Sequence, residues 1–152
     1  MSTDIVIAGG GLNGCALAVA LARAGLGVTV VEARPSGGTP EFDGRAYALA
    51  LASQRLLARI GVWSAVADEA QPILEIKVSD GRAGEGPSPL TLGFDHAEIE
   101  EGPMGFMVQD RHLRPALEAA MAEAGVHHLT RERVVAQAPL GGGIAATLAS
   151  GT

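Results

Sequence analysis

The sequence has a single cysteine, few cationic residues and no long apolar run, and each shortage excludes a class of protein. Cys15 stands alone among 152 residues, so an intramolecular disulfide and a thiol-rich metal site are excluded, and we expect no metal. The 11 Lys and Arg residues form no basic stretch and the net charge is -6, which argues against a nucleic-acid partner.

The first residues and the apolar stretches argue against export and membrane spanning. The opening Met-Ser-Thr-Asp lacks the basic segment of a signal peptide. The stretch from Cys15 to Leu21 is too short and too rich in alanine to cross a bilayer. We therefore expect a cytoplasmic location; peripheral membrane attachment, association with a biosynthetic complex and the oligomeric state stay open.

What is present predicts a packed α/β fold that opens with a strand, a helix and a parallel strand. Hydrophobic residues make up 47% of the chain and charged residues 18%, as in a globular protein. Residues 4–8 and 28–31 are short apolar runs typical of buried strands, and residues 13–24 have helical spacing up to a capping Gly25. The apolar stripe of this helix contains Leu17, Leu21 and Ala24.

Further along, helical and strand-like patterns alternate. Leu49, Leu56 and Ile60 predict a helix from near Ala46 to Gly61. The other expected elements are a short helix over 64–69, strands over 73–81, 89–95 and 104–108, an amphipathic helix over 110–124 capped by Asp110, a parallel strand over 126–130 and a C-terminal β-meander whose hairpin turns at 140–143.

The glycine-rich turn after the first strand has a spacing with a known physical purpose. Gly9, Gly11 and Gly14 fit G-x-G-x-x-G: the first allows a tight turn, the second lets a pyrophosphate approach the backbone, and the third lets the helix pack closely. Glu32, at the end of the second strand, is placed to accept both ribose hydroxyls and to repel a 2′-phosphate. Together, the glycine fingerprint and Glu32 predict that the bound dinucleotide is FAD or NAD rather than NADP. The alternative is a βαβ unit that binds no nucleotide and has a surface glutamate.

Beyond the fingerprint, the sequence resembles a known family. The segments "DIVIAGGGLNGCALAVALARAGLGVTVVEARP", "FDGRAYALALASQRLLARIGVW" and "GFMVQDRHLRPALEAAM" are similar to the flavin-dependent aromatic monooxygenases of the para-hydroxybenzoate hydroxylase group, and most of all to the ubiquinone-biosynthesis hydroxylases. The resemblance implies a Rossmann-like FAD-binding domain and an enzyme that uses FAD, NAD(P)H and O2 to hydroxylate a small phenolic substrate, with no side-chain nucleophile.

The resemblance also implies roles for individual residues. Arg45 matches a family arginine beside the flavin side of the cofactor, Gln109 and Arg111 match the stretch that places one polar residue on FAD, and Arg34 accompanies Glu32 near the adenine. For each of these, a solvated surface residue is the alternative. The expected cofactor-binding residues are Gly9, Gly11, Leu12, Asn13, Gly14, Glu32, Ala33, Arg34, Arg45, Gln109 and Arg111.

The sequence also departs from the family. The downstream Asp-Gly segment and the later Gly-Asp motif are not recognisable, and "SDG" at 79–81 is typical of a hairpin turn. We therefore expect the N-terminal part of such an enzyme, inactive alone, with residues 1–72 and 104–152 in the FAD-binding domain and 73–103 in a β-rich insertion of the substrate-side sheet. Another FAD-dependent oxidoreductase and a non-catalytic nucleotide-binding module stay open.

The lone cysteine and two adjacent histidines are the remaining candidates for reactive or metal-binding side chains. Cys15, on the first turn of the helix, is expected to be a buried packing residue, with a reactive thiol of lowered pKa as the alternative. His127 and His128 are adjacent on an expected strand and so face opposite ways, which argues against a shared metal.

Overall fold

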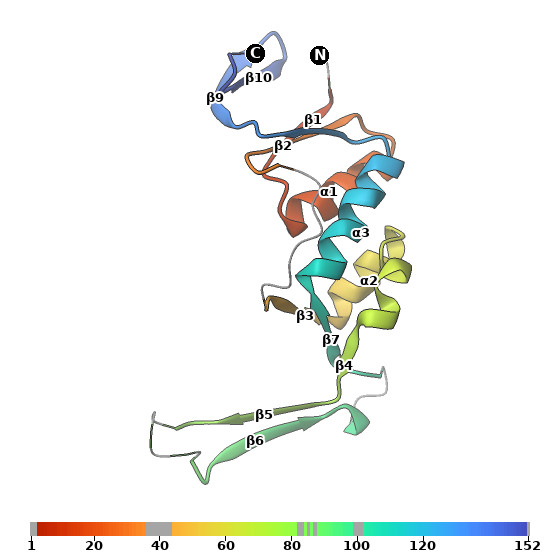
Figure 1. The fold of residues 1–152 in the computed structure, drawn as a ribbon, viewed down its shortest axis with the longest axis vertical. Helices are drawn as coiled ribbons and strands as arrows, with labels where there is room; N and C mark the ends of the chain where they lie inside the picture. Colours follow the sequence, from red (N-terminus) through yellow and green to blue (C-terminus); the bar gives the residue numbers. More distant parts are fainter. Residues whose placement is uncertain are drawn as a thin grey trace.

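The computed structural model describes residues 3–35, 44–81, 84, 86, 88–98 and 102–151. It is an α/β structure with one parallel sheet and three small antiparallel sheets. Figure 1 shows an elongated molecule with the parallel sheet and the C-terminal hairpin toward one end, the α-helices in the middle and a long hairpin at the other end.

The N-terminal strand, helix and strand form as the apolar pattern predicts. β1 (Ile5–Ala8) pairs in parallel with β2 (Val28–Glu32), and α1 (Leu12–Arg23) connects them. The expected third parallel strand is also present, because β8 (His127–Thr130) pairs with β2 and gives the order β1-β2-β8. The central β2 is buried over Val28 to Val31, as a continuous β-branched run requires.

The buried stripe of α1 differs from the expected one. Cys15, Ala18 and Val19 are buried, whereas Leu17 is 51% exposed. The predicted stripe through Leu17 was therefore wrong. Small residues face inward because α1 packs against the third helix, α3 (Asp110–Glu123), and close approach of two helices favours small side chains.

The segment expected to begin the second helix is instead a strand. Residues Ala46–Ala50 form β3, which pairs antiparallel with β7 (Gly105–Gln109), and α2 starts only at Leu51 and ends at Arg59. β4 (Gln71–Ile73) pairs with the other side of β7 and completes the order β3-β7-β4. Pairing with a distant strand thus overrides the helical propensity of the alanines and leucines.

The third helix buries the predicted face but is not capped as predicted. Leu113, Leu117 and Met121 are buried in the core between α1, α3 and β2. Gln109 is the N-cap, without a side-chain capping bond, and Asp110 is the first helical residue. The expected cap at Asp110 is therefore wrong, and its carboxylate contacts other side chains, described below.

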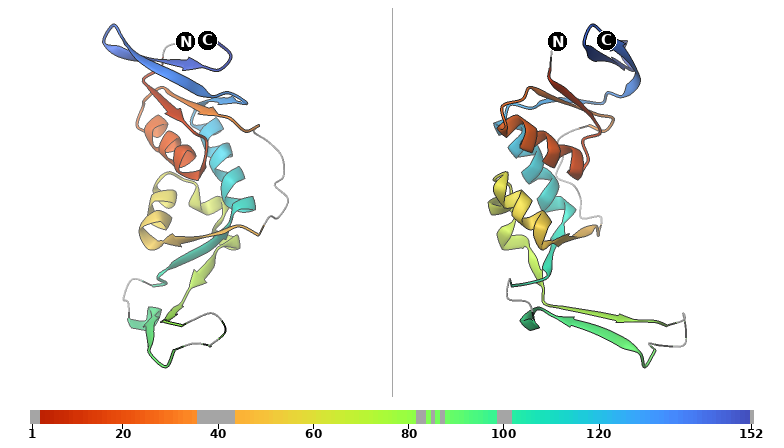
Figure 2. Two further views of the ribbon diagram at one scale, coloured as in Figure 1. Left: turned by 90° about the vertical axis from the view of Figure 1, so that its left-hand side faces the viewer. Right: turned by 180° about the vertical axis from the view of Figure 1, so that it is seen from behind.

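Two hairpins lie at opposite ends of the molecule (Figure 2). One pairs β5 (Glu75–Ser79) with β6 (Thr91–Asp95), and the other pairs β9 (Val134–Leu140) with β10 (Gly143–Leu148), as expected for the tail. The connection from Ser79 to Thr91 is longer than the tight turn predicted at "SDG". The described tail thus contains the expected hairpin, and a C-terminal β-meander with further strands stays a prediction.

Short 3₁₀ helices complete the described structure. The short helix expected over 64–69 is two such turns, and a third follows β6; they are η1 (Trp63–Ala65), η2 (Ala67–Glu69) and η3 (His96–Glu98). None of the helices in the described part of the chain has the length and apolar character that a membrane crossing requires.

Candidate functional site

The glycine-rich loop between β1 and α1 has a different physical constraint at each glycine. Gly9 has a φ of +112°, which favours glycine, and its N–H donates to the Val31 carbonyl at 2.8 Å. A Cβ at Gly14 would overlap the Gly9 carbonyl oxygen, so this position must stay bare for the helix to pack. Gly11 has a φ of -70° and nothing within 4 Å of an added Cβ. The absence of a side chain at Gly11 is therefore required neither by the turn nor by the packing of the helix.

Glu32 connects the end of β2 to this loop. Its Oε2 accepts the Gly10 N–H at 2.6 Å, and its Oε1 accepts the Arg34 N–H at 2.9 Å and Nε–H at 3.2 Å. Burial would raise the pKa of Glu32, but the hydrogen bonds from Arg34 and Gly10 outweigh burial and lower the pKa below its usual range. The carboxylate is thus held ionised at the edge of the loop.

Gly10 is a site position that the fingerprint does not specify. A Cβ there would lie 3.0 Å from the Glu32 Cβ and 3.2 Å from its Oε2. A side chain at this position would push Glu32 away from the loop. The signal for it in the sequence is the middle glycine of three in a row, which the fingerprint spacing alone does not explain.

An open cleft of about 710 Å³ runs from the glycine loop toward the antiparallel sheet. Its walls are the loop and first turn of α1, strand β3, helix α2 and the N-terminal half of α3. Of the expected residues, Gly9, Gly11, Leu12, Asn13 and Gly14 line it. A smaller pocket of about 100 Å³ lies on the Glu32 side, lined by Gly10, Glu32, Arg34, Pro35, Arg114, Glu118 and His128.

The remaining expected residues lie outside the lining of this cleft, and two of them, Glu32 and Arg34, line the smaller pocket. Arg45 precedes β3, and its Nη2 lies 4.0 Å from Asp110 Oδ2. Gln109 ends β7 with its Oε1 buried and without a hydrogen-bond partner among the described residues. Arg111 is exposed, and its Nε lies 3.1 Å from His112 Nε2. Ala33 is exposed directly after β2.

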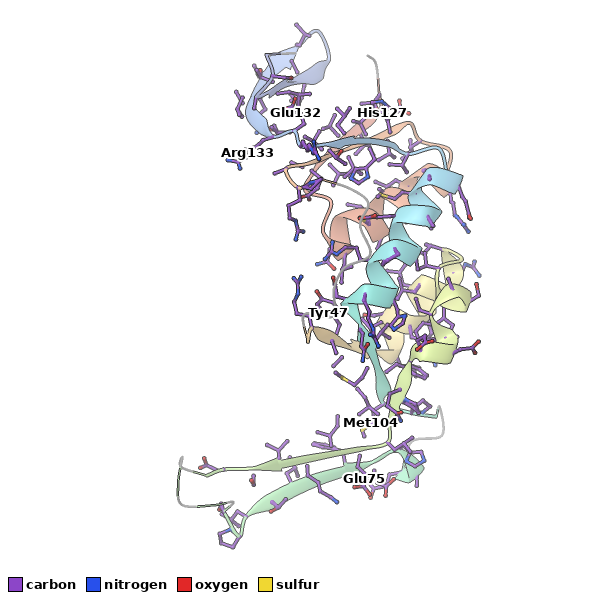
Figure 3. The ribbon with its side chains drawn as sticks, in the orientation of Figure 1. Tyr47, Glu75, Met104, His127, Glu132 and Arg133 are labelled. Carbon is purple, nitrogen blue, oxygen red and sulfur yellow. The ribbon has the colours of Figure 1, made fainter. Side chains whose placement is uncertain are left out.

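A buried ion pair that sequence reasoning missed stands at the base of α3. Asp110 accepts hydrogen bonds from Arg114 Nε at 3.0 Å and Nη2 at 2.9 Å, and from the Tyr47 hydroxyl at 3.0 Å. Figure 3 labels Tyr47, which lies on β3 near the start of α3. Burial opposes ionisation of Asp110, but Arg114 and Tyr47 outweigh it and lower its pKa. The i, i+4 spacing of Asp110 and Arg114 was the available signal.

Cys15 is a packing residue, as expected. Its side chain is 1% exposed, and its Sγ lies 3.3 Å from the Gly10 carbonyl oxygen. Burial, the largest cause, raises the pKa of its thiol to about 11. A reactive thiolate on the first turn of α1 is therefore wrong.

Comparison with known proteins gives a consistent set of matches. Residues 2–151 match the family described as FAD binding domain. The chain is 48% identical over 120 residues to the ubiquinone hydroxylase UbiL of Rhodospirillum rubrum, covering 75% of this chain and 26% of that protein. It is 35% identical over 123 residues to the 3-demethoxyubiquinol 3-hydroxylase of Escherichia coli, covering 78% and 30%.

Solved structures share the fold. The ternary complex of aklavinone-11 hydroxylase with FAD and aklavinone superposes with a TM-score of 0.73 at 26% identity, covering 99% of this chain and 30% of that one. The anhydrotetracycline hydroxylase OxyS of Streptomyces rimosus gives a TM-score of 0.75 at 21% identity, covering 99% and 29%. The chain thus spans about a quarter to a third of the proteins it matches.

Proposed function

The chain belongs to the FAD-binding domain family, and on that premise we propose that it holds the ADP half of FAD for a flavin-dependent monooxygenase acting on a phenolic substrate. The observation that carries this proposal is the bare face of Gly11, which opens into the large cleft with Glu32 at the neighbouring edge of the loop. A side chain at Gly11 would meet no protein atom, so its absence keeps space for a ligand.

The described residues fit such a group chemically. The N-terminal N–H groups of α1 and its positive dipole end suit a pyrophosphate. No acidic side chain lies in the first turn of α1 to compete with an anion. The ionised Glu32 suits ribose hydroxyls and disfavours a 2′-phosphate. Gln109 Oε1 is buried without a partner among the described residues and so offers an acceptor.

The proposed activity of the whole enzyme is hydroxylation of an aromatic ring, with NAD(P)H as reductant and O2 as oxidant. When bound, FAD supplies the redox chemistry. This chain's residues bind and orient the cofactor at its ADP end, and Arg45 is proposed to lie along the flavin side. Relatives named as ubiquinone and demethoxyubiquinol hydroxylases favour a ubiquinone precursor as substrate.

Calorimetric titration of the 152-residue chain with FAD, and separately with ADP, tests the cofactor proposal. Glu32→Gln is expected to weaken ADP binding about 10- to 100-fold, because hydrogen bonds to a charged group contribute roughly 1.5–3 kcal/mol. Gly11→Val is expected to abolish ADP and FAD binding without changing the melting temperature. Failure of the folded chain to bind either ligand would contradict the proposal.

Gly93→Val is the matched control for Gly11→Val. Gly93 lies on β6, far from the cleft, and an added Cβ there also meets nothing within 4 Å. This variant is expected to bind ADP as the parent does. Tighter binding of FAD than of ADP would support contacts at the flavin end, and equal affinities would favour the alternative of a module that binds only the nucleotide.

A further inference from the structure

One arginine, Arg114 on α3, borders both the cleft along the glycine loop and the smaller pocket beside Glu32. No other described residue lines both. A molecule that extends from Glu32 along the glycine loop therefore passes the Arg114 side chain, which is 18% exposed.

The Arg114 side chain is fixed in place by the protein. Asp110 accepts from its Nε and Nη2, and the Tyr47 hydroxyl in turn donates to Asp110. Because two hydrogen bonds define the plane of the guanidinium, its rotamer freedom is already lost in the folded protein. A ligand that contacts it is spared the entropic cost of ordering a long side chain.

Polar groups around Arg114 have hydrogen-bonding capacity left over. A guanidinium carries five N–H donors, and the described residues provide it with acceptors only from Asp110. His128 Nε2, in the smaller pocket, is buried without a partner in the described part of the chain. Buried polar atoms are normally hydrogen-bonded, so these atoms point to a polar ligand or water in this space.

Arg114 offers a phosphate a positive partner beside the acidic side chains of the smaller pocket. Glu32 and Glu118 line the smaller pocket and would repel a phosphate, so a phosphate beside them needs a compensating cation. A planar guanidinium also matches phosphate oxygens in two-pronged geometry.

We propose that Arg114 is a binding residue for the phosphate groups of the dinucleotide, and that Asp110 and Tyr47 are positioning residues that hold its guanidinium. This inference rests on the proposed function. It assigns to the middle of α3 a contact that the glycine fingerprint and Glu32 do not supply.

The test compares ADP with adenosine as calorimetric probes of the 152-residue chain. Arg114→Met is expected to weaken ADP binding about 10- to 100-fold, the effect of losing hydrogen bonds to a charged group, and to leave adenosine binding unchanged. Arg114→Lys is expected to recover part of the ADP affinity, since charge is kept and the planar fork is lost. Arg59→Met, an exposed arginine on α2 that lines neither cavity, is the matched control.

A double variant keeps the test valid if the single substitution unfolds the protein. Asp110→Leu with Arg114→Met replaces the whole ion pair by apolar groups, which is often tolerated. It is expected to melt cooperatively and to show the same loss of ADP affinity. Folded Arg114 variants that bind ADP like the parent overturn the inference while leaving the dinucleotide site intact. A parent chain that binds neither ADP nor FAD overturns both.

Discussion

The parallel-sheet end of the molecule and the β5–β6 hairpin have similar apolar strand residues but differ in what covers them. Val30 on β2 is fully buried beneath α1 and α3, whereas Val78 on β5 and Leu92 on β6 are more than half exposed. In the hairpin, Val78 pairs with Leu92 and Ile76 with Phe94, which places all four on one face. An apolar strand pattern therefore specifies conformation and pairing, but its burial depends on a helix supplied elsewhere in the chain.

The same contrast holds for charged groups. The Asp110–Arg114 pair is almost buried on the Asp110 side, and a tyrosine hydroxyl supports it. The Lys77–Glu75 pair on the hairpin is exposed on both sides, although its 2.8 Å separation is as short. Distance alone therefore does not measure what an ion pair contributes, because water competes for the exposed pair.

Leucine-to-alanine substitutions in the two regions should differ most in their effect on the free energy of unfolding. Leu117→Ala on α3 is expected to lower the free energy of unfolding by about 3 kcal/mol, because it leaves a cavity in the core. Leu92→Ala on the hairpin is expected to change it by less than about 0.5 kcal/mol. Urea denaturation followed by circular dichroism measures both, and equal losses would contradict the comparison.

Breaking the buried ion pair should have the second-largest difference in effect on the free energy of unfolding. Asp110→Asn is expected to cost roughly 3 kcal/mol at pH 7, the low end for a buried pair, since Arg114 is partly exposed. Lys77→Met, its counterpart on the hairpin, should have no measurable effect.

The pH dependence of this pair has a defined sign. Because the pKa of Asp110 is lowered on folding, its stabilising effect is full above the ordinary value of 3.8 and is lost as the pH falls below that value. The stability difference between parent and Asp110→Asn should therefore shrink between pH 5 and pH 2 in denaturation series. A difference that stays constant over this range would exclude the assigned role.

Two glycine substitutions separate packing from ligand space within the loop. Gly14→Ala is expected to destabilise the fold by roughly 1–3 kcal/mol, despite the higher helix propensity of alanine, because the new methyl overlaps the Gly9 carbonyl oxygen. Gly11→Ala should leave stability within about 0.5 kcal/mol. Thermal melting with and without ADP distinguishes them: the Gly11 variant should melt normally and lose only the ADP-induced increase.

The smallest effect on stability is expected where the hairpin is made polar. Ile76→Thr together with Phe94→Ser should leave the urea midpoint nearly unchanged, since both side chains are exposed. Because uncovered apolar strand faces promote association, the double variant should sediment as a smaller species at high concentration than the parent. Identical sedimentation of the two proteins would show that this face does not promote self-association of the chain.

The elements whose evidence is local in sequence were predicted well. β1, α1 and β2 follow from apolar runs and glycine spacing, and α3 follows from its apolar period, because each pattern lies within one segment. β3 was missed because Ala46–Ala50 carries no strand signal of its own: the segment becomes a strand by pairing with β7, far along the chain.

The candidate site divides in the same way. Gly9, Gly11, Gly14 and Glu32 could be predicted because their spacing is a fixed consequence of the βαβ turn, and their cofactor roles stay predictions. Arg114 was not predicted, because its proposed role depends on where α3 lies against the sheet and on Tyr47 from another strand. The cofactor roles of Arg45, Gln109 and Arg111 stay predictions for the titrations to test.

The direct junction of β7 and α3 has a mechanical consequence. Gln109 ends the strand and Asp110 begins the helix, so no loop separates the antiparallel sheet from the helix that carries Arg114. At this junction, the hydroxyl of Tyr47, on the neighbouring strand β3, donates a hydrogen bond to Asp110. We therefore expect a displacement of the β3-β7-β4 sheet to be passed directly to α3, and so to Arg114 in the wall of the cleft.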